Sequence, residues 1–131
     1  MDTVLACGID IVEVPRIRAL CERHGDRFLR RVWAAGERSR ASGLPDPATF
    51  LAGRFAAKEA VLKVLGCGIF SGIPLPEIEI GAHESGEPYC VLAGEAQRRA
   101  RSRGVDRILL SISHTGAYAV AQAIGIGAAK A

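Results

Sequence analysis

The sequence contains few aromatic residues and few lysines. Aromatic residues make up 5% of the 131 residues, and they are not interleaved with the basic ones as stacking on nucleic-acid bases would require. The net charge is +3, which is small for a domain that binds nucleic acid through its charge. The interpretation as a basic nucleic-acid-binding domain therefore depends on the arginines alone. Nucleic-acid affinity that falls steeply with salt concentration would support that alternative.

Paired-cysteine motifs and targeting segments are also absent from the sequence. The four cysteines are too far apart to form a Cys-x-x-Cys metal site. Their apolar surroundings favour buried free thiols over disulfides or zinc ligands, which indicates a reducing cytoplasm. The N-terminus carries Asp2 and no basic region, so we expect no signal peptide.

Residues 108–129 contain no Asp, Glu, Lys or Arg, and such a run is long enough for a membrane helix. Its polar residues alternate as in strands, however, so we predict two strands and no membrane protein. Apolar residues make up 49% and charged residues 24% of the chain. This balance is typical of a soluble protein, and the length suits a single domain covering residues 1–131.

The periodicities predict an α+β fold in which an antiparallel sheet packs with a long central helix. We expect strands at 4–14, 77–81, 89–92, 108–113 and 118–124, and shorter helices at 16–24 and 94–103. Residues 36–44 read as a polar loop or a helical turn. The central helix begins near Asp46 and Pro47 and ends at Gly66.

The second half of the central helix carries charges in apolar surroundings. At about 100° per residue, Lys58 lies in the middle of a leucine and phenylalanine stripe. Glu59 and Lys63 are four residues apart, so they are neighbours on an alanine-rich face. Buried charges are costly unless they are paired or bind a ligand or metal. The alternative is an ordinary core helix with one Glu59–Lys63 ion pair and a partly exposed Lys58.

Two further residues stand out at the predicted strands. Asp10 lies between Ile9 and Ile11, so its side chain points away from their face. Gly8 in the same strand indicates a bulge or the close approach of another segment. His114 follows the end of a strand, a common place for a ligand-binding group. The alternatives are an exposed edge position for Asp10 and a loop histidine without a role.

Arginines gather around the first predicted helix. Arg16 is followed by four others at positions Arg23, Arg27, Arg30 and Arg31. A docking surface for an acidic protein would use such residues, because arginine binds carboxylates well. The alternative is a solvated helix face.

Asp10 and Glu59 can both be explained as ligands of one metal ion. Two carboxylates without histidine or thiolate partners suit Mg²⁺, which commonly shares its ligands with substrate phosphates and water. The nearby lysines and the glycines of the loop that follows the helix suit those phosphates. These residues together indicate magnesium-dependent transfer of a phosphate-containing group.

The chain resembles the holo-acyl-carrier-protein synthases, the short bacterial 4′-phosphopantetheinyl transferases, in several motifs that occur in the right order. The N-terminal motif is Gly8-Ile9-Asp10-Ile11-Val12-Glu13 with Arg16-Ile17. The second is Phe55-Ala56-Ala57-Lys58-Glu59-Ala60-Val61-Leu62-Lys63 with Gly66-Cys67-Gly68. Further matches are Gly86, Pro88, and Ser111-Ile112-Ser113-His114-Thr115 with Tyr118-Ala119.

Two departures from the family pattern are visible. Cys67 occupies a position where a small hydroxyl residue is usual, and this difference should have little effect on the reaction. Ala34-Ala35-Gly36-Glu37 is a loose version of the family's short acidic motif, and we assign Glu37 no role from the sequence.

The resemblance implies a 4′-phosphopantetheinyl transferase fold and a reaction of fatty acid biosynthesis in the cytoplasm. Coenzyme A donates its 4′-phosphopantetheine arm to a serine of apo acyl carrier protein, leaving adenosine 3′,5′-bisphosphate. By the same likeness the enzyme is a homotrimer with active sites at the subunit interfaces. The competing interpretation is a module that binds coenzyme A or the carrier without catalysis, and it requires no metal.

The resemblance also implies roles for individual residues. Asp10 and Glu59 hold Mg²⁺, and Glu59, or a water on the metal near it, takes the serine proton. Lys63 stabilises charge on the transferring phosphoryl or leaving group. The remaining roles are coenzyme A binding by Arg54, Lys58 and His114, and carrier-protein binding by Arg16.

Overall fold

The computed structural model describes residues 1–68 and 71–128, which form one α+β domain. The elements in chain order are β1 (Asp2–Glu13), α1 (Val14–His24), α2 (Asp26–Val32), α3 (Ala35–Ser42), α4 (Ala48–Val64), the 3-10 helix η1 (Leu75–Glu77), β2 (Ile78–Ala82), β3 (Pro88–Leu92), α5 (Gly94–Ser102), β4 (Arg107–His114) and β5 (Tyr118–Ala128). Part of the predicted loop, residues 69–70, lies outside the described residues, as do 129–131.

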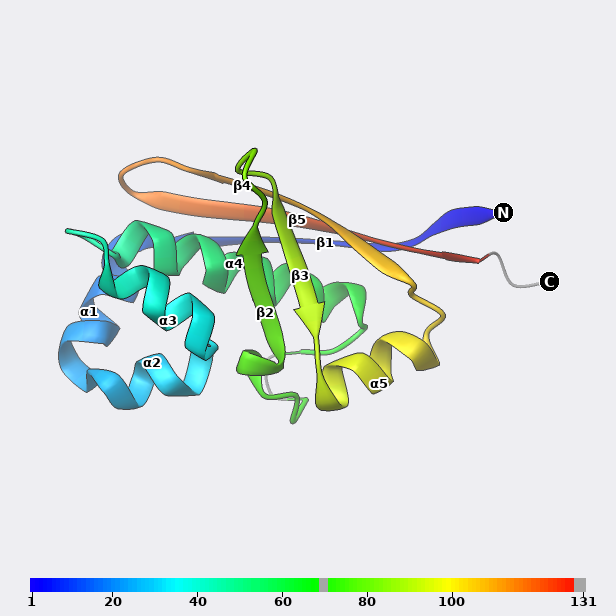
Figure 1. Ribbon diagram of the computed structural model, residues 1–131, viewed down its shortest axis with the longest axis horizontal. Coiled ribbons are helices and arrows are strands. Elements are labelled where there is room, and N and C mark those ends of the chain that lie inside the picture. The colour runs from blue at the N-terminus through cyan, green and yellow to red at the C-terminus, as the bar shows by residue number, and fades with distance from the viewer. Residues whose placement is uncertain (69–70, 129–131) are drawn as a thin grey trace.

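Three long strands form an antiparallel sheet in the order β1-β5-β4, and β2 and β3 form a separate hairpin. In the long sheet Asp10 pairs with Ala121, which pairs in turn with Ile112. Helix α4 runs along this sheet, α1–α3 gather at one end, and α5 lies near the other (Figure 1). The predicted antiparallel sheet packed with a long central helix is confirmed.

Small residues let α4 pack closely on the sheet. Ala52, Ala56 and Ala60 are fully buried. A Cβ atom on Gly8 would lie 2.2 Å from the backbone oxygen of Ala60, so only glycine fits at this crossing. The close approach predicted for Gly8 is therefore present, whereas the register irregularity of β1 lies between Val4 and Ala6.

The two faces of β1 have opposite character, because successive side chains alternate across a strand. Ile9 and Ile11 are 59% and 64% exposed on the face that α4 does not cover. Asp10 faces the other way and its side chain is 22% exposed. The prediction that Asp10 points away from the isoleucines is confirmed, and it is the acid that faces the helix.

The ends of α4 follow the sequence signals to within about one residue. Asp46 Oδ1 accepts a hydrogen bond of 3.3 Å from the Ala48 backbone N–H, and the helix begins at Ala48. Gly66 follows the helix with φ of +72°, a conformation that favours glycine. The polar segment 36–44, read as a loop or a helical turn, mostly belongs to α3, an eight-residue helix that begins at Ala35. Helix α2 was not predicted.

Aromatic packing joins the short helices to α4. Trp33 is fully buried, and its indole Nε1 donates to the Leu51 carbonyl oxygen at 3.2 Å. The ring of Phe28 meets Trp33 edge-on at 5.3 Å between centroids, and the Phe55 ring lies 6.5 Å from that of Trp33. This cluster ties the end of α2 to the first half of α4.

All four cysteines are free thiols, as predicted. Cys7 is exposed and the other three are partly buried, so burial is less complete than expected. No helix within residues 1–68 and 71–128 is long and apolar enough to span a membrane.

Candidate active site

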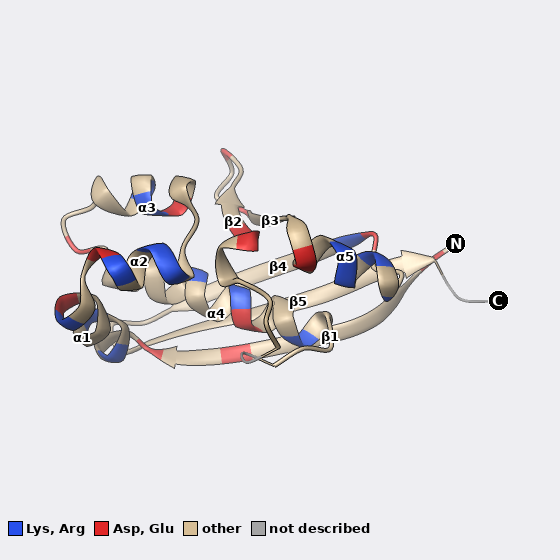
Figure 2. Ribbon diagram, turned by 90° about the horizontal axis from the view of Figure 1, so that it is seen from below, with Lys and Arg blue, Asp and Glu red and all other residues tan. Residues whose placement is uncertain are grey.

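Asp10, Glu59 and Lys63 come together where β1 crosses α4, and we call them the open cluster. The missing side chain of Gly8 allows the strand to lie against the helix beside Lys63. The Lys63 ammonium donates to the Ile9 carbonyl oxygen at 2.6 Å and lies 3.7 Å from Asp10 Oδ1. Figure 2 shows acidic residues on β1 beside the charged bands of α4. The structure therefore brings together three of the predicted site residues.

Glu59 carries an unused acceptor in the open cluster. Its Oε1 is buried and has no hydrogen-bond partner, and the only other such side-chain atom among the described residues is Arg54 Nε. Buried polar atoms are usually paired, so an orphan acceptor indicates a ligand, ion or water at this position.

The surroundings disfavour the ionised forms of both carboxylates, and burial is the main cause. Burial raises the pKa of Glu59, and the neighbouring Asp10 raises it further, against the lowering effect of Lys63. Burial also raises the pKa of Asp10, against the lowering effect of the Lys63 ammonium and two hydrogen bonds. A cation placed between the carboxylates would relieve this repulsion and burial cost.

These observations fit a hard divalent cation. The open cluster offers carboxylate oxygens and no histidine or thiolate, which is the donor chemistry that Mg²⁺ prefers. Within the described parts of the chain, no group of three or more His, Cys, Asp or Glu side chains could hold a metal. Asp10 and Glu59 would therefore supply two protein ligands and leave the remaining positions to water and substrate oxygens.

Lys58 and Glu37 form a second charged group, which we call the closed pair. The side chains are 0% and 1% exposed, and Lys58 Nζ lies 2.6 Å from Glu37 Oε1. The ammonium also donates to the carbonyl oxygens of Leu75 and Ile78. Its three donors are thus all used inside the protein, which leaves none for the coenzyme A phosphate that was predicted to bind Lys58.

Glu37 is the residue whose role the sequence did not reveal. Its Oε1 accepts from the Ala34 backbone N–H at 2.7 Å, and its Oε2 accepts from the Ile80 N–H at 3.0 Å. A glutamate three residues after the N-cap residue, here Ala34, commonly returns to the backbone in this way. That spacing was the available signal, although the partnership with Lys58 has no signature in the sequence.

Arg54 lies one helical turn before Lys58 and is partly buried. Its guanidinium stacks on the Phe50 ring at 4.2 Å from the centroid. Burial, assisted by the nearby Arg40, lowers the pKa of Arg54. A stacked guanidinium with an unpartnered Nε is suited to receive an anion.

His114 lies apart from the open cluster within one chain. It ends β4 and pairs with Ala119, and it is exposed. Asp10 belongs to β1, on the other side of the central strand β5. At the usual strand spacing, two edge strands of such a sheet are about 10 Å apart, so His114 does not join Asp10 in the single chain.

Arg16 lies at a groove of about 360 Å³ between α1, α2 and the segment before β2. Arg31 also lines the groove, and apolar side chains, among them Phe28, Phe55 and Leu75, form much of the rest. Basic residues gather on α1 and α2 in Figure 2. The groove can therefore accept an apolar side chain from a partner whose surroundings are acidic.

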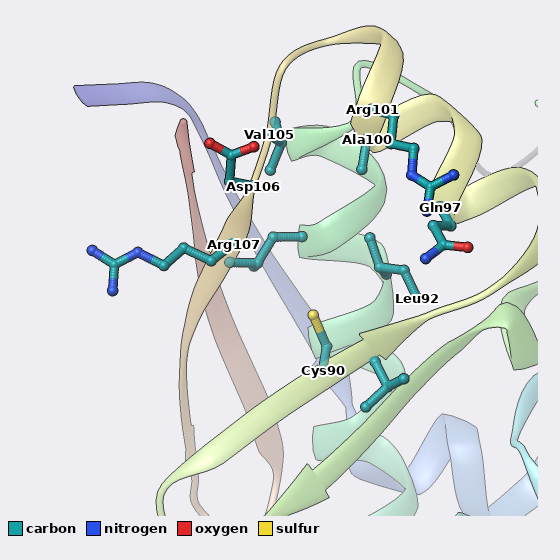
Figure 3. A pocket seen from close by; sticks show the side chains of 10 residues that line it. Cys90, Leu92, Gln97, Ala100, Arg101, Val105, Asp106 and Arg107 are labelled. Carbon is teal, nitrogen blue, oxygen red and sulfur yellow. The ribbon is translucent and has the colours of Figure 1, made fainter. Parts of the chain in front are cut away.

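A separate cavity of about 430 Å³ lies between β3, α5 and β4 (Figure 3). None of the open-cluster residues lines it. Burial raises the pKa of the Cys90 thiol in its wall to about 11, so this thiol stays protonated at neutral pH and is a poor nucleophile.

Comparison with known proteins identifies the relatives of this chain. The family model of the 4′-phosphopantetheinyl transferase superfamily matches residues 6–123. The holo-[acyl-carrier-protein] synthase of Koribacter versatilis is 42% identical over 121 residues, which cover 92% of this chain and 97% of the relative. The crystal structure of the Plasmodium yoelii holo-ACP-synthase is 30% identical, with a TM-score of 0.86 over 98% of this chain and 99% of that one. The Bacillus anthracis synthase in complex with CoA (3′,5′-ADP) is 34% identical, with a TM-score of 0.79 over 95% and 98% of the chains.

Proposed function

The chain belongs to the 4′-phosphopantetheinyl transferase superfamily, and we propose that it is a holo-[acyl-carrier-protein] synthase. It transfers the 4′-phosphopantetheine group from coenzyme A to a serine of apo acyl carrier protein, and adenosine 3′,5′-bisphosphate is released. The observation that carries this proposal is the open cluster, with the unpartnered Glu59 oxygen beside Asp10 and Lys63. We take the whole of residues 1–131 as one transferase domain.

Glu59 is suited to accept the serine proton. Its carboxylate has a free acceptor oxygen and a raised pKa, both of which favour a general base. The serine oxygen then bonds to the phosphorus that carries the pantetheine arm. The bond from that phosphorus to the bridging oxygen breaks, and its electron pair leaves with adenosine 3′,5′-bisphosphate.

Lys63 is suited to stabilise the charge that develops on the phosphoryl oxygens and the leaving group. Its ammonium is held by the Ile9 carbonyl oxygen, which orients it without neutralising it. Asp10 and Glu59 would hold Mg²⁺, which when bound supplies Lewis-acid polarisation of the phosphoryl oxygens. Asp10 thus serves as a ligand that also faces Lys63.

Coenzyme A phosphates require donors beyond the open cluster. Arg54 offers its unpartnered Nε, and His114 offers an exposed imidazole. We propose both as phosphate contacts and leave out Lys58, since its donors are used by Glu37 and two carbonyl groups.

The acyl carrier protein would dock at the groove beside Arg16. The arginines at its rim suit acidic side chains, and its apolar floor suits a buried aliphatic residue of the carrier. Arg16 follows β1 directly through α1, so the groove is tied to the strand that carries Asp10.

A homotrimer with active sites at the subunit interfaces is consistent with the uncovered face of the long sheet. Ile9, Ile11 and Leu109 are 59%, 64% and 46% exposed on this sheet. Large exposed apolar patches commonly mark interaction sites. In such an assembly His114 of one subunit could serve the open cluster of its neighbour, and a measured mass of three chains in solution would support this arrangement.

The proposed reaction places the protein in fatty acid biosynthesis and lipid metabolism, in the cytoplasm. The four free thiols are consistent with a reducing compartment.

The deciding experiment is incubation of the protein with apo carrier, coenzyme A and Mg²⁺, followed by intact-mass spectrometry of the carrier. We expect a mass gain of one phosphopantetheine group, which a carrier with its acceptor serine replaced by alanine does not show. Omission of Mg²⁺ in the presence of a chelator should abolish the gain. A folded protein that leaves the carrier unmodified would instead support the non-catalytic binding module.

A further inference from the structure

The closed pair is costly to keep in an apolar core. Glu37 and Lys58 are the buried charged residues among the described part of the chain, and they are 2% and 0% exposed. Burying two charges requires desolvation that their attraction only partly repays, so such a pair is weak evidence for added stability. A geometric role is the more informative explanation to test.

One contact of each residue in the pair leads to a wall of the Arg16 groove. Lys58 donates to the carbonyl oxygen of Leu75, and Leu75 lines one wall. Glu37 accepts from the backbone of Ala34, two residues after Val32, which lines the opposite wall at the end of α2. Lys58 itself lies one turn after Phe55, which belongs to the same groove.

Lys58 is also linked to the open cluster through the helix backbone. Lys58 directly precedes Glu59 on α4, so movement of the Lys58 turn moves the Glu59 carboxylate with it. Glu37 additionally accepts from Ile80 on β2, which ties the hairpin to this point. The pair therefore joins both groove walls to the helical turn that carries Glu59.

We propose that Glu37 and Lys58 are positioning residues that set the geometry of the carrier-protein groove relative to Glu59. The proposal rests on the proposed function, because it assumes that the acyl carrier protein is the partner in the groove. Neither side chain touches the reacting atoms. Their effect is to hold the wall at Leu75 and the end of α2 at a fixed separation across Phe55.

The test uses the double variant Glu37→Met/Lys58→Met, which replaces the pair with apolar side chains of similar volume. Such replacements of buried ion pairs commonly leave stability unchanged or increase it. We expect wild-type thermal stability, a rise of about tenfold in the KM for apo carrier, and a KM for coenzyme A within about twofold of wild type. The matched control is Glu95→Gln/Arg98→Gln, which removes an exposed ion pair on α5 outside the groove and should leave both KM values unchanged.

A direct binding measurement separates this proposal from the proposed function. Calorimetric titration of apo carrier into each protein, without coenzyme A, should show affinity about tenfold weaker for the double variant than for wild type. Wild-type protein that binds the carrier but does not modify it would overturn the transferase function and leave the groove proposal to be decided by the titration. Wild-type protein that does not bind the carrier would overturn the groove proposal.

A purely structural role predicts the opposite result. A stable double variant with wild-type carrier KM and carrier affinity overturns the positioning role. If the double variant is unfolded, Glu37→Asp serves instead, because it keeps the counter-charge of Lys58 and shortens the side chain by one methylene group. A folded Glu37→Asp variant should show the same selective rise in carrier KM, by about threefold, and an unchanged carrier KM in that variant overturns the proposal.

Discussion

Lys58 and Glu59 are consecutive residues of one helix, yet they belong to charged groups of opposite design. Every donor of Lys58 is used by Glu37 or a backbone carbonyl, and the ammonium has no exposed surface. Glu59 faces the next side of the helix, and one of its oxygens is buried without a partner. The closed pair has all its hydrogen bonds within the protein, whereas the open cluster has a buried acceptor that no protein group fills.

This difference separates a charge that organises the fold from a charge that is available for chemistry. Burial alone does not distinguish them, because it lowers the pKa of Lys58 and raises the pKa of Glu59. The distinguishing feature is whether hydrogen bonds complete the group. In the open cluster two carboxylates share a single ammonium at 3.7 Å from Asp10, so the site favours an additional cation.

The largest expected effect comes from removing an acid of the open cluster. Asp10→Ala or Glu59→Ala should leave the fold intact and lower the Mg²⁺-dependent transfer rate by about a thousandfold, roughly 4 kcal/mol of transition-state stabilisation. Initial rates of carrier modification measure the effect, with Glu95→Gln as an exposed control. Near-normal rates in both alanine variants would refute the assignment.

Breaking the closed pair on one side should instead destabilise the fold. Lys58→Met leaves Glu37 buried without its counter-charge, which typically costs about 3–5 kcal/mol of unfolding free energy. Urea denaturation of wild type and variant measures the difference. A variant as stable as wild type would mean that the Glu37 carboxylate is not charged or not buried in solution.

Lys63 should affect the rate more than the stability, because its side chain is about half exposed. Lys63→Gln should slow transfer by about a hundredfold through loss of charge stabilisation. Lys63→Arg keeps the charge and is the matched variant that should retain more activity. Equal rates for the two variants would show that the charge at this position is not what matters.

The ionised Glu59 carboxylate of the open cluster should lower the free energy of unfolding at neutral pH. Glu59 has a folded-state pKa above its ordinary value of 4.5, so the folded protein binds more protons than the unfolded one between the two values. Stability therefore falls as the pH rises through this window, and the ionised carboxylate destabilises the fold above it. Glu59→Gln should raise the unfolding midpoint by about 2–5 °C at pH 7.

The gain from Glu59→Gln should shrink as the pH falls below the ordinary value of 4.5, where the carboxyl is protonated in both states. Thermal unfolding of both proteins at pH 7 and at acidic pH measures this. A midpoint for the variant below that of wild type at pH 7 would contradict the sign of the argument.

The sequence carried enough information to predict the strands, the central helix and the open cluster, but not the helix α2 or the full length of α3. Alternation placed Asp10 opposite Ile9 and Ile11, helical spacing joined Glu59 to Lys63, and Gly8 marked the close crossing of strand and helix. These features depend on local periodicity and on a residue without a side chain, both of which are readable along the chain.

The closed pair was beyond such reasoning. Glu37 and Lys58 are 21 positions apart, and the carbonyl groups of Leu75 and Ile78 that also bind Lys58 lie further along the chain. Helical spacing identified Lys58 as a charge in an apolar stripe, but not the side chain that meets it. The packing of α3 against α4 and β2 gives every hydrogen-bond donor of Lys58 a partner within the protein. One oxygen of the neighbouring Glu59 has no such partner, and neither outcome can be read from local spacing.

The most direct test of the contrast is a calorimetric titration of Mg²⁺ into the protein with coenzyme A present. We predict one Mg²⁺ site in wild type, the same site in Glu37→Met/Lys58→Met, and affinity at least about tenfold weaker in Asp10→Asn. This readout does not depend on turnover. Equal Mg²⁺ affinity in wild type and Asp10→Asn, or its loss from the Glu37→Met/Lys58→Met variant alone, would contradict the assignment of the open cluster as the reactive site.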